Sequence, residues 1–120
     1  MNRLAAFAAL LGFLAVAFGA FGAHALDGRL APEGTDWWHT ATLYALPHAA
    51  AAFAVGLSGR AGLMRPGGWL LAIGAAVFAG TLYAMALGAP RWFGAITPLG
   101  GTFMLAGWTL CAIGGLRSRN

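Results

Sequence analysis

Four long runs of the sequence contain no Asp, Glu, Lys or Arg, and this feature most restricts how the chain can fold. The runs are residues 4–26, 37–57, 69–87 and 96–116. An α-helix rises about 1.5 Å per residue, so each run is long enough to cross the roughly 30 Å hydrocarbon core of a bilayer. We therefore predict an all-α, integral membrane protein of four spanning helices, with residues 1–120 in one domain.

The composition agrees with a membrane environment and argues against a soluble or nucleic-acid-binding protein. Of the 120 residues, 60% are hydrophobic and only 8% are charged, whereas soluble domains carry about 25% charged residues. The net charge is +4, but the basic residues lie between and beside the apolar runs. That placement is typical of signals for membrane orientation, so we expect no nucleic-acid partner.

The arginines also predict which way the chain crosses the membrane. With four spans, both termini and the middle connection share one side, which then holds five of the seven basic residues. These five are Arg3, Arg60, Arg65, Arg117 and Arg119. The other side, called the acidic side below, holds two arginines and all three acidic residues. Because basic loops stay in the cytoplasm, we predict an up-down four-helix bundle in the cell inner membrane, with both termini cytoplasmic.

Small residues indicate how the helices pack. Leucine and lipid are equally apolar, so association in a bilayer depends on close backbone contact and on hydrogen bonds between helices. Small residues recur at four-residue spacing in three of the runs, and residues four apart share a helix face. We predict close helix contacts at Gly19, Gly80 and Gly107, and structural roles for Pro47 and Pro98. Aromatic side chains at the membrane interfaces are a second expectation, with Trp37, Trp38 and Trp92 on the acidic side and Trp69 on the other.

Most polar side chains within the runs lie in the halves nearer the acidic side. They are His24, His39, Thr42, Tyr44, His48, Thr81, Tyr83 and Thr102. We treat these residues as one candidate polar or ligand-binding site. No group of ligating residues has the spacing of a metal motif, because neither HExxH nor CxxCH occurs. We therefore expect no metal and no cofactor.

His48 is the most informative member of this set. It lies 11 residues after Trp37, a helical rise of about 16 Å that places it near the bilayer midplane. Tyr44, four residues earlier, shares its helix face. Pro47 has no backbone N–H, so it frees the carbonyl of Leu43, and we expect a kink and an extra acceptor beside His48.

Two interpretations of His48 remain open. An ionisable residue at this depth indicates a functional site, which would bind a ligand or handle a proton. The alternative is a neutral histidine that only hydrogen-bonds between helices. Covalent catalysis is not favoured, because no serine or carboxylate lies inside a run to serve as nucleophile or to orient a histidine. We therefore expect that the chain is not an enzyme.

Four motifs along the chain resemble those of a known family. In order, they are Gly19-Ala-Phe-Gly-Ala-His24-Ala-Leu26, then Trp38-His-Thr-Ala with Tyr44 and His48-Ala, then Phe78-Ala-Gly-Thr-Leu-Tyr83, and finally Ile96-Thr-Pro-Leu-Gly-Gly101 with Gly107-Trp108. This set is similar to the YgdD-like family of small inner-membrane proteins, which has related mitochondrial transmembrane proteins in eukaryotes. The resemblance covers nearly the whole chain. It implies a four-helix membrane protein of unknown function, and it supplies no catalytic residues.

Three functional hypotheses follow. The first is a non-enzymatic membrane protein, either an accessory subunit of a complex or a binder of lipid or a small hydrophobic ligand in the polar cluster. The second is an oligomeric transporter or channel that uses the residues around His48, and the third is a haem or metal protein ligated by histidines. Expected partners are the lipid bilayer and either another membrane protein or further copies of the chain.

Overall fold

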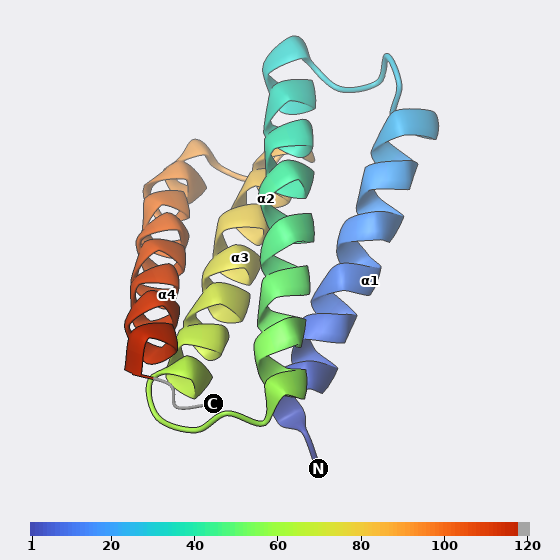
Figure 1. Cartoon of the computed structure of the whole chain (residues 1–120). Helices are drawn as coiled ribbons and strands as arrows, with labels where there is room; N and C mark the ends of the chain where they lie inside the picture. Colours follow the sequence, from blue (N-terminus) through green and yellow to red (C-terminus); the bar gives the residue numbers. More distant parts are fainter. Residues whose placement is uncertain (118–120) are drawn as a thin grey trace.

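The computed structural model describes residues 1–117, which form four long helices joined by short connections (Figure 1). The helices are α1 (Arg3–His24), α2 (Pro32–Ser58), α3 (Met64–Ala86) and α4 (Thr97–Arg117), and the 3-10 helix η1 (Arg91–Ala95) comes just before α4. Each α-helix, with η1 counted into the last one, is long and apolar enough to cross a membrane. The prediction of an all-α chain with four membrane-crossing helices is confirmed.

Two of the helices begin earlier than the apolar runs. α2 begins at Pro32 instead of residue 37, and α3 begins at Met64 instead of residue 69. A proline in the first turn of a helix lacks an N–H that would have no partner there anyway. Pro32 and Pro66 use this position, and Glu33 lies favourably in the positive first turn of α2. The last residues of these two connections, 32–36 and 64–68, are therefore helical.

The helices form a row in sequence order. α1 packs on α2, α2 on α3 and α3 on α4, whereas α1 touches α3 only slightly. Figure 1 shows α1 and α4 at the two ends of this row, with α2 and α3 between them. The start of α1, the connection from α2 to α3 and the end of α4 lie at one end of the molecule. The connections that follow α1 and α3 lie at the other end, called the acidic end below.

Four glycines bring α3 and α4 into backbone contact. A Cβ placed on Gly100 would lie 2.7 Å from the carbonyl oxygen of Gly74, and a Cβ placed on Gly74 would lie 2.7 Å from that of Gly100. Gly67 and Gly107 repeat the arrangement. A Cβ on Gly67 would lie 3.1 Å from the carbonyl oxygen of Gly107, and a Cβ on Gly107 would lie 2.9 Å from that of Gly67. At each position an α-hydrogen therefore faces a carbonyl of the other helix, a weak hydrogen-bonding contact found where helices meet.

The contact between α1 and α2 also relies on small residues. A Cβ on Gly56 would lie 2.9 Å from the backbone nitrogen of Ala5, and one on Gly19 would lie 3.0 Å from Cγ2 of Thr42. Gly19 thus lies at a helix contact, as Gly107 does. The prediction for Gly80 is wrong, since it is exposed and no atom lies within 4 Å of its Cβ position.

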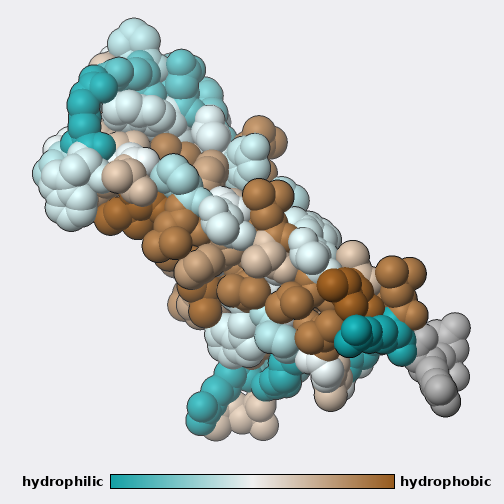
Figure 2. Space-filling model, turned by 90° about the vertical axis from the view of Figure 1, so that its left-hand side faces the viewer, coloured by the Kyte–Doolittle hydropathy of each residue, from teal (hydrophilic) through white to brown (hydrophobic). Residues whose placement is uncertain are grey.

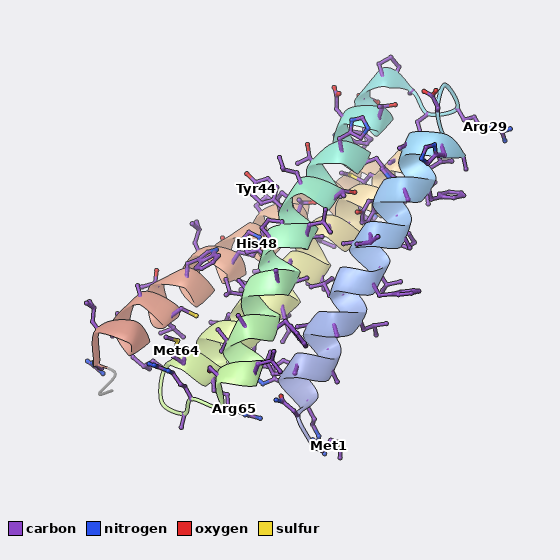
Figure 3. The ribbon with its side chains drawn as sticks, turned by 45° about the vertical axis from the view of Figure 1, so that its right-hand side comes forward. Met1, Arg29, Tyr44, His48, Met64 and Arg65 are labelled. Atoms are coloured by element: carbon purple, nitrogen blue, oxygen red, sulfur yellow. The ribbon has the colours of Figure 1, made fainter. Side chains whose placement is uncertain are left out.

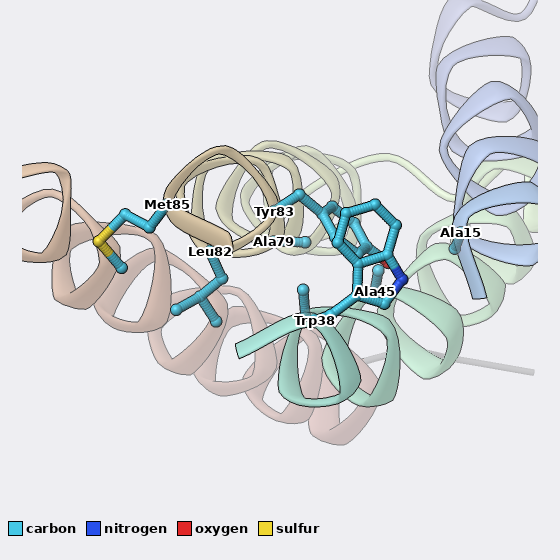
Figure 4. Packing of buried hydrophobic residues seen from close by; sticks show 8 residues of the cluster. Ala15, Trp38, Ala45, Ala79, Leu82, Tyr83 and Met85 are labelled. Carbon is cyan, nitrogen blue, oxygen red and sulfur yellow. The ribbon is translucent and has the colours of Figure 1, made fainter. Parts of the chain in front are cut away.

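Trp38 occupies the core between α1, α2 and α3 (Figure 4). Its side chain is only 3% exposed, and its indole N–H donates to the carbonyl of Phe18 at 2.8 Å. The ring centroid lies 4.6 Å from that of Tyr83, and Gly22 leaves room for the indole because a Cβ there would overlap it. Trp38 is therefore a packing residue of the core and is not presented to lipid or water.

The outer surface of the row is apolar over its middle. Figure 2 shows hydrophobic residues over the centre of one face and hydrophilic residues toward its two ends. Large apolar side chains are exposed on the outer helices, among them Phe13 on α1 and Leu105 on α4, which are 69% and 71% exposed. A water-soluble monomer does not present such a continuous apolar belt, whereas lipid chains cover it without cost.

Candidate functional site

The eight polar residues predicted as one cluster do not come together as a single site. Four of them enter three separate hydrogen-bonded contacts through their side chains, and His24, His39, Tyr44 and Thr102 remain exposed. The Thr102 hydroxyl donates to the carbonyl of Pro98 in its own helix at 2.9 Å. Within residues 1–117, no group of three or more His, Cys, Asp and Glu side chains is placed to hold a metal ion.

Two of the contacts are pairs of hydroxyl groups that join neighbouring helices. The hydroxyl oxygens of Thr42 on α2 and Tyr83 on α3 lie 2.6 Å apart, next to the buried Trp38. Those of Thr81 on α3 and Thr97 at the start of α4 also lie 2.6 Å apart. Both pairs satisfy polar groups between helices, and Thr97 also lines a hollow of about 360 Å³ whose lining includes Phe78 and Pro98.

The third contact joins α2 to α4 through His48, which is 9% exposed. Its Nε2 lies 2.9 Å from the indole nitrogen of Trp108, and its Nδ1 lies 2.7 Å from the carbonyl of Tyr44. An indole N–H can only donate, so Nε2 must accept and the ring proton resides on Nδ1, which donates to Tyr44. Both ring nitrogens are therefore occupied. Figure 3 shows His48 and Tyr44 on the face of α2 turned toward α4.

This arrangement corrects one expectation and adds one residue. The acceptor beside His48 is the carbonyl of Tyr44, not the carbonyl of Leu43 that Pro47 leaves unpaired, and α2 continues as a helix through Pro47. Trp108 was not predicted to belong to the site. One signal was available, because an indole N–H deep in an apolar run needs an acceptor inside the membrane.

A groove of about 500 Å³ lies beside the His48–Trp108 contact, between α2 and α4. Its lining includes Tyr44, His48, Phe78, Thr102, Leu105 and Trp108. Phe78 belongs to α3, and the Tyr44 ring packs on it with centroids 4.7 Å apart. Tyr44 is 41% exposed. Most of the lining is therefore apolar, with the phenol of Tyr44 and the hydroxyl of Thr102 as its polar groups.

The groove is suited to binding and poorly suited to acid–base or ligation chemistry. His48 has no free ring nitrogen to coordinate an ion or to move a proton. The lining of the groove also includes no carboxylate. A mostly apolar concavity with a few polar groups is the usual form of a site for a hydrophobic small molecule.

Comparison with known proteins decides the family. A family model described as "Protein of unknown function (DUF423)" matches residues 18–101. The chain belongs to this family. The match includes the α2 and α3 side of the groove and ends before Leu105 and Trp108.

Curated relatives agree with this assignment and extend over most of the chain. A UPF0382 membrane protein of Staphylococcus epidermidis is 40% identical over 111 residues, which cover 91% of each chain. The UPF0382 membrane protein YwdK of Bacillus subtilis is 36% identical, covering 91% of this chain and 92% of its own. The UPF0382 inner membrane protein YgdD of Escherichia coli is 36% identical, covering 92% and 87%. No solved structure matches.

These findings confirm the resemblance to the YgdD-like family and the expected localisation. The relatives are named membrane or inner membrane proteins, and this chain has four helices able to cross a membrane. The DUF423 protein described here is a multi-pass protein of the inner membrane.

Proposed function

We propose that this DUF423 protein is a non-enzymatic membrane protein that binds a lipid chain or a similar small hydrophobic ligand between α2 and α4. The observation that supports this most directly is the groove of about 500 Å³, which lies beside the buried His48–Trp108 contact. Its volume and lining match those of sites for small apolar ligands. The partner is then a component of the surrounding bilayer.

The His48–Trp108 contact has a structural role in this proposal. It ties α2 to α4, two helices that otherwise meet little, and so fixes the width of the groove. A transporter would need polar groups that continue along a path through the protein. Here the polar side chains buried between the helices form three separate contacts instead, which favours binding over transport.

We further propose an up-down bundle with both termini in the cytoplasm. Arg3, Arg60, Arg65 and Arg117 belong to the end of the molecule that holds the start of α1 and the end of α4. Arg119, the fifth arginine of that side, lies outside the described residues. The acidic end carries two arginines and three acids, so the positive-inside rule places it outside the cytoplasm.

A pair of matched glycine variants tests the binding proposal. A Cβ on Gly101 would lie 3.9 Å from the Phe78 ring, an ordinary contact, so Gly101→Leu fills the groove without a backbone clash. Gly80→Leu adds the same side chain at a position with no neighbour within 4 Å. The assay is photocrosslinking of the purified protein to a phospholipid that carries a diazirine in its acyl chain, with mass-spectrometric mapping.

The expected result is labelling of Leu105 and Trp108 in the parent and in Gly80→Leu, and its loss in Gly101→Leu. Labelling of Phe13, which is exposed on α1 far from the groove, should stay the same in all three proteins and serves as the internal control. Equal labelling of the groove residues in Gly101→Leu and Gly80→Leu would show that no lipid chain occupies the groove.

A further inference from the structure

At Phe78 and Pro98 the groove adjoins another hollow, which lies nearer the acidic end. This second hollow of about 360 Å³ shares Phe78 and Pro98 with the first and reaches Trp37 and Arg91. Along α4 and η1, the residues that line the two hollows run from Gly94 to Trp108. At about 1.5 Å per helical residue this is a length of about 20 Å. One leaflet of a bilayer has a hydrocarbon depth of roughly 15 Å, so the combined groove accommodates a whole acyl chain.

Charged groups stand where the headgroup of such a lipid would lie. Arg91 forms an ion pair with Glu33, and its guanidinium lies 5.7 Å from the centre of the Trp37 ring. The two charged side chains are 76% and 51% exposed. An exposed ion pair contributes little to stability, so each partner can exchange the other for a charge on a ligand at small cost.

The two side chains suit different parts of a phospholipid headgroup. A guanidinium binds a phosphate through two parallel hydrogen bonds, and a carboxylate binds an ammonium group in the same way that it binds a basic side chain. Arg91 and Glu33 are in contact, and a headgroup with a phosphate and an ammonium a few bonds apart would meet both of them at once.

The charge of the acidic end selects among headgroups. It carries three acids, Asp27, Glu33 and Asp36, and two arginines, Arg29 and Arg91. The formal sum of three negative and two positive charges is −1, which disfavours an anionic headgroup. A zwitterionic headgroup avoids this repulsion and still offers its phosphate to Arg91.

We infer that the combined groove binds a zwitterionic phospholipid with a primary ammonium group, the chemistry of phosphatidylethanolamine. One acyl chain lies along α4 toward Trp108, the phosphate binds Arg91, and the ammonium binds Glu33. This inference rests on the proposed function, because it assigns the headgroup of the lipid whose chain fills the groove.

The test is a native mass spectrometry titration of the purified protein with dioleoyl phosphatidylethanolamine and dioleoyl phosphatidylglycerol, which differ only in their headgroups. Three surface variants are compared with the parent: Arg91→Gln, Glu33→Gln and Arg29→Gln. Arg29 is exposed at the same end and does not line either hollow, so it is the matched control.

We expect the parent to bind the ethanolamine lipid more tightly than the glycerol lipid. Arg91→Gln should weaken binding of both lipids about tenfold, the loss expected for one hydrogen bond between charged groups. Glu33→Gln should weaken only the ethanolamine lipid and so remove the preference, and Arg29→Gln should leave the preference for the ethanolamine lipid in place.

Two results would overturn the inference: equal binding of the two lipids by the parent, or equal effects of Arg91→Gln and Arg29→Gln. Gly101→Leu separates this failure from failure of the proposed function. If Gly101→Leu abolishes binding of both lipids while Arg91→Gln does not weaken it, the acyl groove stands and the headgroup assignment is wrong. If neither substitution changes binding, both proposals are wrong.

Discussion

Replacing Gly100 with alanine is the most direct test of the contact between α3 and α4. The new Cβ would lie 2.5 Å from the backbone nitrogen of Phe78 and 2.7 Å from the carbonyl oxygen of Gly74. Both neighbours are backbone atoms of a helix, so no side-chain rotation relieves the overlap. Ordinary contact starts at 3.4 Å, so the two helices must separate by 3.4 − 2.5, or about 0.9 Å.

The cost has two parts. Overpacking of a close contact typically costs about 1–3 kcal/mol. Separation also weakens the two reciprocal contacts of α-hydrogens with carbonyl oxygens between Gly100 and Gly74, each about 0.5–1 kcal/mol. Gly→Ala inside a helix brings a gain of about 1 kcal/mol in helix propensity. That gain is shared by Gly80→Ala, which meets no neighbour within 4 Å, so the difference between the two variants isolates the contact.

We therefore expect Gly100→Ala to have a free energy of unfolding about 2–5 kcal/mol lower than that of Gly80→Ala. The assay is reversible unfolding in mixed micelles with increasing sodium dodecyl sulfate, followed by circular dichroism. Gly74→Ala should behave like Gly100→Ala, because its Cβ would meet the Gly100 carbonyl oxygen at 2.7 Å. Equal unfolding midpoints for Gly100→Ala and Gly80→Ala would refute the backbone contact.

Three further outcomes are expected. His48→Leu should lower the free energy of unfolding by about 0.6–2 kcal/mol, the range for hydrogen bonds within membranes, and His48→Gln should lower it by less. If His48→Leu is as stable as the parent, the hydrogen bond between His48 and Trp108 does not stabilise the fold. A double-mutant cycle of Thr42→Val and Tyr83→Phe should give a coupling of about 0.6–1.7 kcal/mol in the same assay, and zero coupling would mean that the hydroxyls do not bond. Alkaline phosphatase, which is active only in the periplasm, should be inactive when fused after Asn120, and activity there would reverse the proposed orientation.

Element type was predictable because each apolar run is as long as a bilayer is thick. The residues at which the helices begin were harder to predict. Pro32 and Pro66 interrupt the apolar pattern, and prolines near charged residues resemble a turn as much as a first helical turn. A proline fits the first turn of a helix because the backbone N–H that it lacks would have no partner there. The sequence alone does not specify whether Pro32 and Pro66 lie in such a first turn or in a loop.

Small residues were the right signal for packing, but the spacing that matters is different from the one we followed. Four-residue spacing selected Gly80, which is exposed. The glycines in contact are seven apart on each helix, Gly67 and Gly74 on α3 against Gly107 and Gly100 on α4. A seven-residue repeat keeps one face of a helix turned toward an antiparallel neighbour over two turns, as in coiled coils.

The site was only partly predictable. The depth of His48 and its spacing from Tyr44 correctly indicated a histidine engaged in hydrogen bonds inside the helix row. Its other partner, Trp108, lies 60 residues away in the sequence. No spacing rule connects positions on α2 and α4, because these two helices are separated in the sequence by the whole of α3.

The row of helices bears on how the protein is made. Every large interface joins a helix to the one synthesised just before it. When α2 enters the membrane, α1 is already there for it to pack on. In the same way, α2 precedes α3 and α3 precedes α4. Contacts between segments close in sequence form quickly, since little chain entropy is lost in closing them. The order of synthesis is then also the order of assembly. At each stage, the only helix face that still awaits a partner is the face of the last helix made, on which the next helix packs.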